Sequence, residues 1–163
     1  TGQEIATGDP IGVIGNTGAE TGSHVHWEVR VGGDRYGDTY NPVLWMVPYV
    51  GHGTIAGRIM DSRDDVLLDH DITLRNMGAA VVAATTSYIF DGTVNQVNSD
   101  PNWEENFVFG DVPAGRYQVV TVVNGQRIVE EVEVFEGMTS FVELKPSIAA
   151  TAQPVETQPT PAP

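Results

Sequence analysis

The stretch "GRYQVVTVVNGQRIVEEVEV", residues 115–134, consists of two runs rich in β-branched residues joined by an Asn-Gly pair. Asn124 and Gly125 suit a type I′ turn, because both central positions of that turn take positive φ. In the second run Glu131 and Glu133 alternate with valines, as in a strand with one face in water and one in a core. In the first run alternation alone does not say which face is inner. The stretch predicts an antiparallel β-hairpin.

Short strands at similar spacing surround this hairpin. They are predicted at 53–61, 70–76, 81–90, 105–112, 115–123, 127–135 and 138–145. Seven short strands with tight turns favour an all-β fold, an antiparallel seven-stranded β-sandwich. A turn is expected from Pro113 to Gly115, and the core is expected to contain Phe107, Phe109 and Tyr117.

The first fifty residues show a different pattern of predicted elements. Short strands are predicted at Ile11–Ile14 and at 24–31, as a partial antiparallel sheet. Asn41 before Pro42 indicates the start of a short helical turn. The apolar residues of that turn, expected to pack on the preceding sheet, are Leu44, Trp45 and Met46.

Two changes in composition divide the chain. Gly51 to Gly53 form a natural joint, so we expect one domain at 1–50 and the β-sandwich at 51–145. Residues 146–163 are rich in Pro and Thr and contain no aromatic residue. Such a segment cannot bury enough apolar surface to offset its ordering entropy, so it is expected to be a disordered, extended linker.

Composition excludes several classes of partner. The formal net charge of −14 argues against nucleic acid and against an anionic membrane surface bound through a basic patch. It leaves a cationic or zwitterionic partner open. The absence of cysteine excludes disulfides and leaves the compartment open. No apolar run approaches the ~20 residues of a membrane helix. Because the chain begins at Thr1 without a visible signal peptide, we expect a processed product or fragment whose export signal lay upstream.

The segment "TGSHVHWEVR", residues 21–30, is the candidate chemical site. On a strand, His24, His26 and Glu28 share one face, because side chains alternate between faces. The opposite, apolar face carries Val25, Trp27 and Val29. Two histidines alone are a weak signal, since structural histidines are common, but their face suits a metal or a catalytic group.

The context of these histidines closely resembles the C-terminal half of the catalytic domain in the M23 family of zinc metallopeptidases, the LytM or lysostaphin type. That family shows G-Q…G-x-x-I-G-x-x-G-x-T-G…T-G-x-H-x-H-x-E followed by Asn-Pro. The matching residues are Gly2, Gln3, Gly8, Ile11, Gly12, Gly15, Thr17, Gly18, Thr21, Gly22, His24, His26, Glu28, Asn41 and Pro42. The resemblance extends to about residue 46. The departures from the usual Pro, Leu and Phe are Ser23, Val25 and Trp27.

The resemblance implies roles for three residues. His26 corresponds to a Zn²⁺ ligand, and His24 to a general base or transition-state stabiliser beside the zinc-bound water. Catalytic zinc takes three protein ligands and lowers the pKa of a water in its open position. Glu28 would orient a histidine or form a salt bridge with Arg30, and both alternatives stay open. The loop residues Asn16, Thr17 and Thr21 would shape the substrate groove, or the glycines around them would simply serve tight turns.

The remaining ligands of that family come from an H-x-x-x-D motif and a later Tyr-x-His segment, both of which precede the matched region. His52 is expected to be an exposed linker residue and His70 a solvated loop residue. The acidic run at 61–71 lacks the glycine and the terminal glutamate of an EF-hand, so calcium is not expected there. One ligand does not hold zinc tightly. This polypeptide alone is therefore expected to be inactive, with its zinc site completed by ligands upstream of residue 1.

The second module is similar to carboxypeptidase regulatory-like, transthyretin-type β-sandwiches. The similarity rests on "GTIAGRIMD" at 53–61, "FVFGDVPAGRY" at 107–117 and the closing "VEVFEGMTSFVEL". Such modules position or present a partner domain. Tyr88 and Trp103 would form an aromatic sugar-binding platform or serve as ordinary packing residues, with packing favoured.

These observations predict a fragment of an exported bacterial metalloendopeptidase. Its substrate would be the peptide stems or cross-bridges of peptidoglycan, outside the cell or in the cell envelope, with further domains beyond both ends of the chain. The alternatives are a non-catalytic M23-like wall-binding or activator protein, and an adhesin-like β-protein. The presence of both His24 and His26 favours the enzyme, since a binder has little need of that pair.

Overall fold

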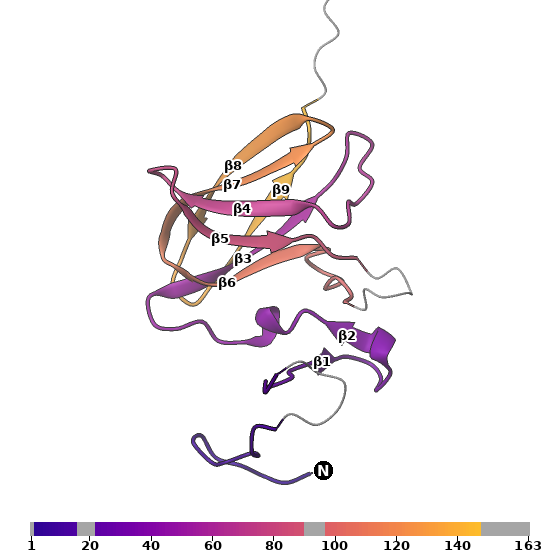
Figure 1. The fold of residues 1–163 in the computed structure, drawn as a ribbon, viewed down its shortest axis with the longest axis vertical. Helices are drawn as coiled ribbons and strands as arrows, with labels where there is room; N and C mark the ends of the chain where they lie inside the picture. The colour runs from indigo at the N-terminus through magenta and orange to yellow at the C-terminus, as the bar shows by residue number, and fades with distance from the viewer. Residues whose placement is uncertain (1, 16–21, 90–96, 148–163) are drawn as a thin grey trace, which may run out of the picture.

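The computed structural model describes residues 2–15, 22–89 and 97–147, and their regular elements are β-strands and two short 3₁₀ helices (Figure 1). In order, the elements are β1 (Val29–Arg30), the 3₁₀ helix η1 (Tyr36–Asp38), β2 (Thr39–Tyr40), the 3₁₀ helix η2 (Pro42–Trp45), β3 (His52–Ile59), β4 (Asp71–Asn76), β5 (Val81–Thr86), β6 (Phe107–Pro113), β7 (Gly115–Val123), β8 (Gln126–Val134) and β9 (Thr139–Leu144). The all-β prediction is confirmed.

Strands β3 to β9 form two sheets that share one core, and we call them the two-sheet body. The sheets have the orders β6-β3-β9 and β5-β4-β7-β8 (Figure 1). All of these pairs are antiparallel except β3–β9, which is parallel. The prediction of antiparallel sheets is therefore confirmed with one exception, the parallel pair β3–β9. After β8 the chain crosses to the other sheet, where β9 joins β3, a strand far away in sequence.

The central hairpin is confirmed. Val123 of β7 pairs with Gln126 of β8, which leaves Asn124 and Gly125 as a two-residue turn. Their φ values are 51° and 79°. Positive φ at both positions is the requirement of the type I′ turn, which matches the twist of the two strands.

The predicted core residues are buried. Phe107 and Phe109 of β6 and Tyr117 of β7 are exposed by 8% or less. The Tyr117 hydroxyl donates to the Pro113 carbonyl at 2.8 Å, across the turn by which the chain passes from one sheet to the other. At Gly57 an added Cβ would lie 2.1 Å from the Phe107 ring, so the glycine makes room for this aromatic core.

The two strands predicted near the N-terminus are largely absent. Residues 2–15 have no regular secondary structure, so the strand predicted at Ile11–Ile14 is wrong. Of the strand predicted at 24–31, only Val29 and Arg30 are in a ladder, opposite Tyr40 and Thr39. A strand needs a hydrogen-bonded neighbour, and β2 offers this segment only two residues.

The helical turn predicted from Asn41 and Pro42 is confirmed. It is η2, and the Asn41 side chain accepts a hydrogen bond from the Val43 amide at 3.0 Å. The predicted packing is wrong for Trp45 and Met46, which are 55% and 56% exposed. The turn lies instead against β6, with Val43 over Gly110.

Two further points concern the whole chain. The predicted linker covers residues 146–163, and all of it from residue 148 onward lies outside the described residues. Within the described ranges, we find no helix long and apolar enough to cross a membrane.

Candidate functional site

His24 and His26 lie in an extended segment that leads into β1, and both are exposed. Nδ1 of His24 is 2.9 Å from the Gly22 carbonyl oxygen. Nε2 of His26 is 2.6 Å from Oε1 of Glu28. A histidine that donates from one ring nitrogen to a carbonyl or carboxylate presents the other nitrogen as a metal ligand or proton acceptor. The other nitrogens are Nε2 of His24 and Nδ1 of His26.

Glu28 joins the histidine to an arginine. Its second oxygen, Oε2, accepts from Arg30 Nε at 2.8 Å and forms an ion pair with Nη2 of the same arginine at 2.6 Å. These contacts hold the pKa of Glu28 below its ordinary value of 4.5, the hydrogen bond from His26 having the largest effect and that from Arg30 the next. One carboxylate therefore contacts both partners named in the two alternatives, His26 and Arg30, and its role stays a prediction.

The apolar side of this segment is not buried. Val25 is 70% exposed and Trp27 is 62% exposed. The segment from 22 to 28 also has no ladder partner among the described residues.

A cavity of about 250 Å³ adjoins His24. It is lined by Ile11, Gly12, Val13, Ile14, Gly15, His24 and Val25. The glycine-rich segment and the histidine segment therefore face one hollow. Asn16, Thr17 and Thr21, the other predicted groove residues, lie outside the described residues.

The other two histidines differ from the expectations. His52 begins β3 and is half-buried. Its ring lies edge-on to that of Tyr49, with the ring centroids 6.4 Å apart, so it is not an exposed linker residue. His70 is also half-buried, with Nδ1 2.9 Å from the Leu68 carbonyl oxygen and its amide bonded to Ser87. In both cases a backbone carbonyl engages the ring, as is common for structural histidines.

The acidic run near His70 is organised by its own hydrogen bonds. Asp61 accepts from the backbone amides of Arg63 and Asp65 and from the Arg63 side chain. The amide of Arg63 has the largest part in lowering the pKa of Asp61. Asp61 therefore closes a tight turn with its carboxylate.

The fit to zinc is partial. Nowhere in residues 2–15, 22–89 and 97–147 do three His, Cys, Asp or Glu side chains lie close enough together to hold a metal ion. Catalytic zinc takes three protein ligands. The described residues thus fit one position of such a centre and not the whole of it.

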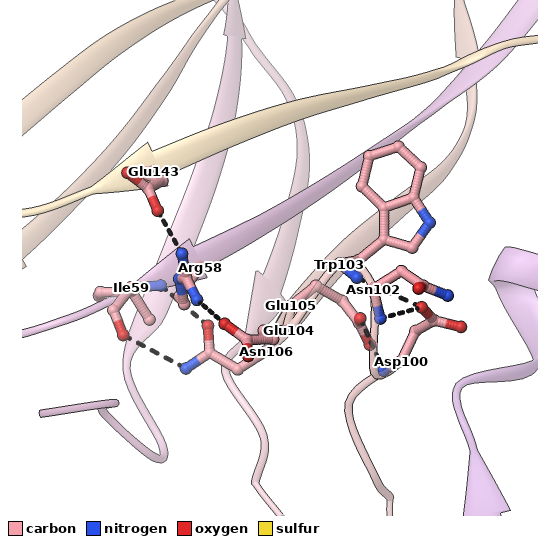
Figure 2. Close-up of polar contacts among 9 residues, drawn as sticks. All are labelled: Arg58, Ile59, Asp100, Asn102, Trp103, Glu104, Glu105, Asn106 and Glu143. Carbon is pink, nitrogen blue, oxygen red and sulfur yellow. Dashed lines mark hydrogen bonds and ion pairs between the residues drawn. The ribbon is translucent and has the colours of Figure 1, made fainter. Parts of the chain in front are cut away.

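The two aromatic residues considered for sugar binding have separate partners. Trp103 packs on Phe141 with ring centroids 5.7 Å apart. The Tyr88 hydroxyl donates to the buried Glu105 at 2.7 Å. Figure 2 shows Trp103 on the side of its loop away from Arg58, whose guanidinium lies between Glu104 and Glu143. Both aromatics therefore serve packing and hydrogen bonding.

Sequence reasoning missed Asn98. Its amide donates to the Thr39 carbonyl at 2.7 Å, and its side chain donates to the carbonyls of Gly37 and Thr39 at 2.8 and 3.0 Å. The only sequence signal was its place in the turn-rich run between the predicted strands, and that signal does not identify a partner.

Comparisons with known proteins bear on the histidine segment. The model of Peptidase family M23 matches residues 1–42. The N-terminal segment is similar to Peptidase family M23. This match contains His24, His26 and Glu28, and it supports a peptidase-type domain for this part of the chain.

No curated protein matches the chain. Among solved structures, "The Bacillus anthracis TIE protein" is similar, with 21% identity and a TM-score of 0.42. The match covers 58% of this chain and 16% of that one.

Proposed function

We propose that this chain contributes the C-terminal part of the catalytic domain of an M23-type zinc metalloendopeptidase of the LytM or lysostaphin type. In this proposal residues 1–50 belong to the peptidase domain and residues 51–145 to a carboxypeptidase regulatory-like module. The observation that carries it is the pair of exposed imidazoles, His24 and His26, inside the segment matched by the family.

The proposal gives the two histidines different tasks. His26, held at Nε2 by Glu28, offers Nδ1 as one zinc ligand. His24, held at Nδ1 by the Gly22 carbonyl, offers Nε2 as a base or as a donor to a developing oxyanion. Bound zinc would supply a water of lowered pKa. The other ligands would come from polypeptide outside the described residues.

The proposed substrate is a peptide bond in the stems or cross-bridges of peptidoglycan, which places the protein outside a bacterial cell or in its envelope. Support comes from the family match and from the hollow beside His24, where glycines allow close approach of an extended peptide. The net charge of −14 agrees with a partner other than nucleic acid.

The test is hydrolysis of purified peptidoglycan by the protein prepared with whatever residues precede Thr1 in its natural sequence. His26→Ala should abolish the release of peptide termini. His24→Ala should lower turnover by ~10²-fold or more. The matched control is His70→Ala, a histidine in the loop before β4 whose loss should leave turnover unchanged.

Full turnover in His26→Ala would refute the proposed site. A wild-type protein that binds peptidoglycan without cleaving it would instead identify the non-catalytic wall-binding alternative.

A further inference from the structure

The N-terminal segment is attached to the two-sheet body at several separate places. Val43 of η2 lies against Gly110 of β6, where an added Cβ would come within 2.6 Å of the Val43 side chain. The amide of Tyr49 donates to the Asp111 side chain at 2.9 Å. The amide of Gly51 donates to Glu136 at the same distance. These contacts place residues 42–51 on the body, but none reaches the strand pair that adjoins the histidines.

Asn98 makes that further connection. We call β1 and β2 the N-terminal ribbon. Asn98 forms a parallel bridge with Tyr40 of β2, so it extends the ribbon as a one-residue third strand. Three hydrogen bonds from this one residue reach the ribbon and the 3₁₀ turn between its two strands, one from its backbone amide and two from its side chain. Thr39, which accepts two of them, is buried.

The loop that carries Asn98 is itself fixed to the body. Glu105 is fully buried, and its carboxylate accepts from the Tyr88 hydroxyl at 2.7 Å and from the Asp100 amide at 2.9 Å. The next residue, Asn106, is also fully buried and bonds to both backbone groups of Ile59 in β3 (Figure 2). The loop therefore ends on two buried polar anchors, Glu105 and Asn106, and Glu105 also holds Tyr88 and Asp100.

A series of contacts connects the ribbon to His26. Thr39, which receives the bonds of Asn98, is opposite Arg30 in the β1–β2 ladder. Arg30 holds Glu28, and Glu28 holds His26. Each step is a paired residue or a short hydrogen bond between described residues.

We propose that the two-sheet body is a positioning element for the histidine segment and that Asn98 is its positioning residue. The body, through Asn98, would fix the direction from which the Glu28–His26 pair meets whatever it binds. This goes beyond the proposed peptidase function, and only its consequence for catalysis rests on that function.

The test is solution NMR on the 163-residue chain labelled with ¹⁵N. Residual dipolar couplings from the amides of β1 and β2 and from those of β3 to β9 should fit one common alignment. Asn98→Asp keeps the size of the side chain and removes its two donated bonds. We expect it to make the ribbon couplings depart from the alignment fitted to β3 to β9, and to speed exchange of the residue-98 amide about tenfold or more.

The matched control is Asn102→Asp, the same change at an exposed position on the same loop. It should leave the common alignment intact, and it should leave the exchange rate of the residue-98 amide within about twofold of wild type. Asn98→Ala, which adds no charge, should repeat the effect of Asn98→Asp. In every variant the amides of β7 and β8 should stay protected.

Three results would overturn the proposal. The wild-type ribbon couplings would already depart from the alignment fitted to β3 to β9, or Asn98→Asp would behave like Asn102→Asp, or both Asn98 variants would unfold the body. No metal enters these measurements, so their failure is distinct from a failure of the peptidase assay.

Discussion

At the scale of single residues, Glu28 decides how the histidine segment is arranged. It contacts a histidine with one oxygen and an arginine with the other, and it is less exposed than either. A carboxylate with two cationic or donor partners is stabilised in its ionised form. The lowered pKa of Glu28 follows from that pair.

This arrangement makes a prediction about the titration of Glu28. Followed by ¹³C NMR of its carboxyl carbon, the midpoint in wild type should lie below the ordinary value of 4.5. Since the pKa is lowered in the folded state, the contact stabilises the fold above pH 4.5 and loses its effect as the pH falls through the lowered value.

Two variants separate the causes. His26→Ala should raise the midpoint more than Arg30→Ala, because the hydrogen bond from His26 is the larger cause. Equal midpoints in wild type and both variants would show that the carboxylate does not hold these partners in solution.

Residue types and spacing predicted candidate side chains in this segment and named a histidine and Arg30 as alternative partners of Glu28. The H-x-H-x-E pattern predicted His26 and Glu28 as candidates and left two partners open for Glu28. It could not predict which ring nitrogen Glu28 engages, since that depends on backbone and side-chain torsions. Asn98 was out of reach because its acceptors lie 59 and 61 residues away in sequence.

At the scale of elements, the sequence predicts structure formed by contiguous residues. It does not predict which distant segments pair. The β7–β8 hairpin could be predicted because its turn and both of its strands are contiguous in sequence. The strand predicted at Ile11–Ile14 is wrong because apolar residues between turns do not supply a ladder partner. The parallel pairing of β9 with β3 could not be predicted, because it joins strands separated by most of the two-sheet body.

The hairpin turn gives a prediction at this scale. Gly125→Ala should lower the free energy of unfolding by about 1 kcal/mol, because a side chain at a φ of 79° is strained. Asn124→Gly is the matched control and should change it by less than about 0.5 kcal/mol, since glycine takes positive φ freely. Urea denaturation with an unchanged m value measures both. Equal stabilities for Gly125→Ala and wild type would contradict a type I′ turn.

At the scale of the whole molecule, a fully buried carboxylate is unusual in so acidic a chain. Glu105 has no exposure, and burial is the main cause of its raised pKa. Burial also raises the pKa of Tyr88, and the neighbouring Glu105 adds to that effect. The pair holds the loop to the body at the cost of keeping a charge away from water.

The stability of the fold should therefore depend on pH through Glu105. Because its pKa is raised on folding, its contribution is fully present below the ordinary value of 4.5 and is lost as the pH rises through the folded value. Glu105→Gln removes this contribution. The free energy of unfolding of Glu105→Gln minus that of wild type should rise with pH above 4.5.

Urea denaturation at several pH values between ~4 and ~7 measures this difference. Asn102→Ala, which removes no titrating group, serves as the control and should show a constant difference from wild type. A constant difference for Glu105→Gln as well would contradict the buried, raised-pKa carboxylate.

The most direct measurement is the zinc content of the protein prepared with whatever residues precede Thr1. Wild type should bind about one zinc ion per chain, as a single catalytic centre requires. His26→Ala should lose that zinc, whereas His24→Ala should keep it. Full zinc occupancy in His26→Ala would contradict the account, because the metal would then be held without the histidine to which we assign it.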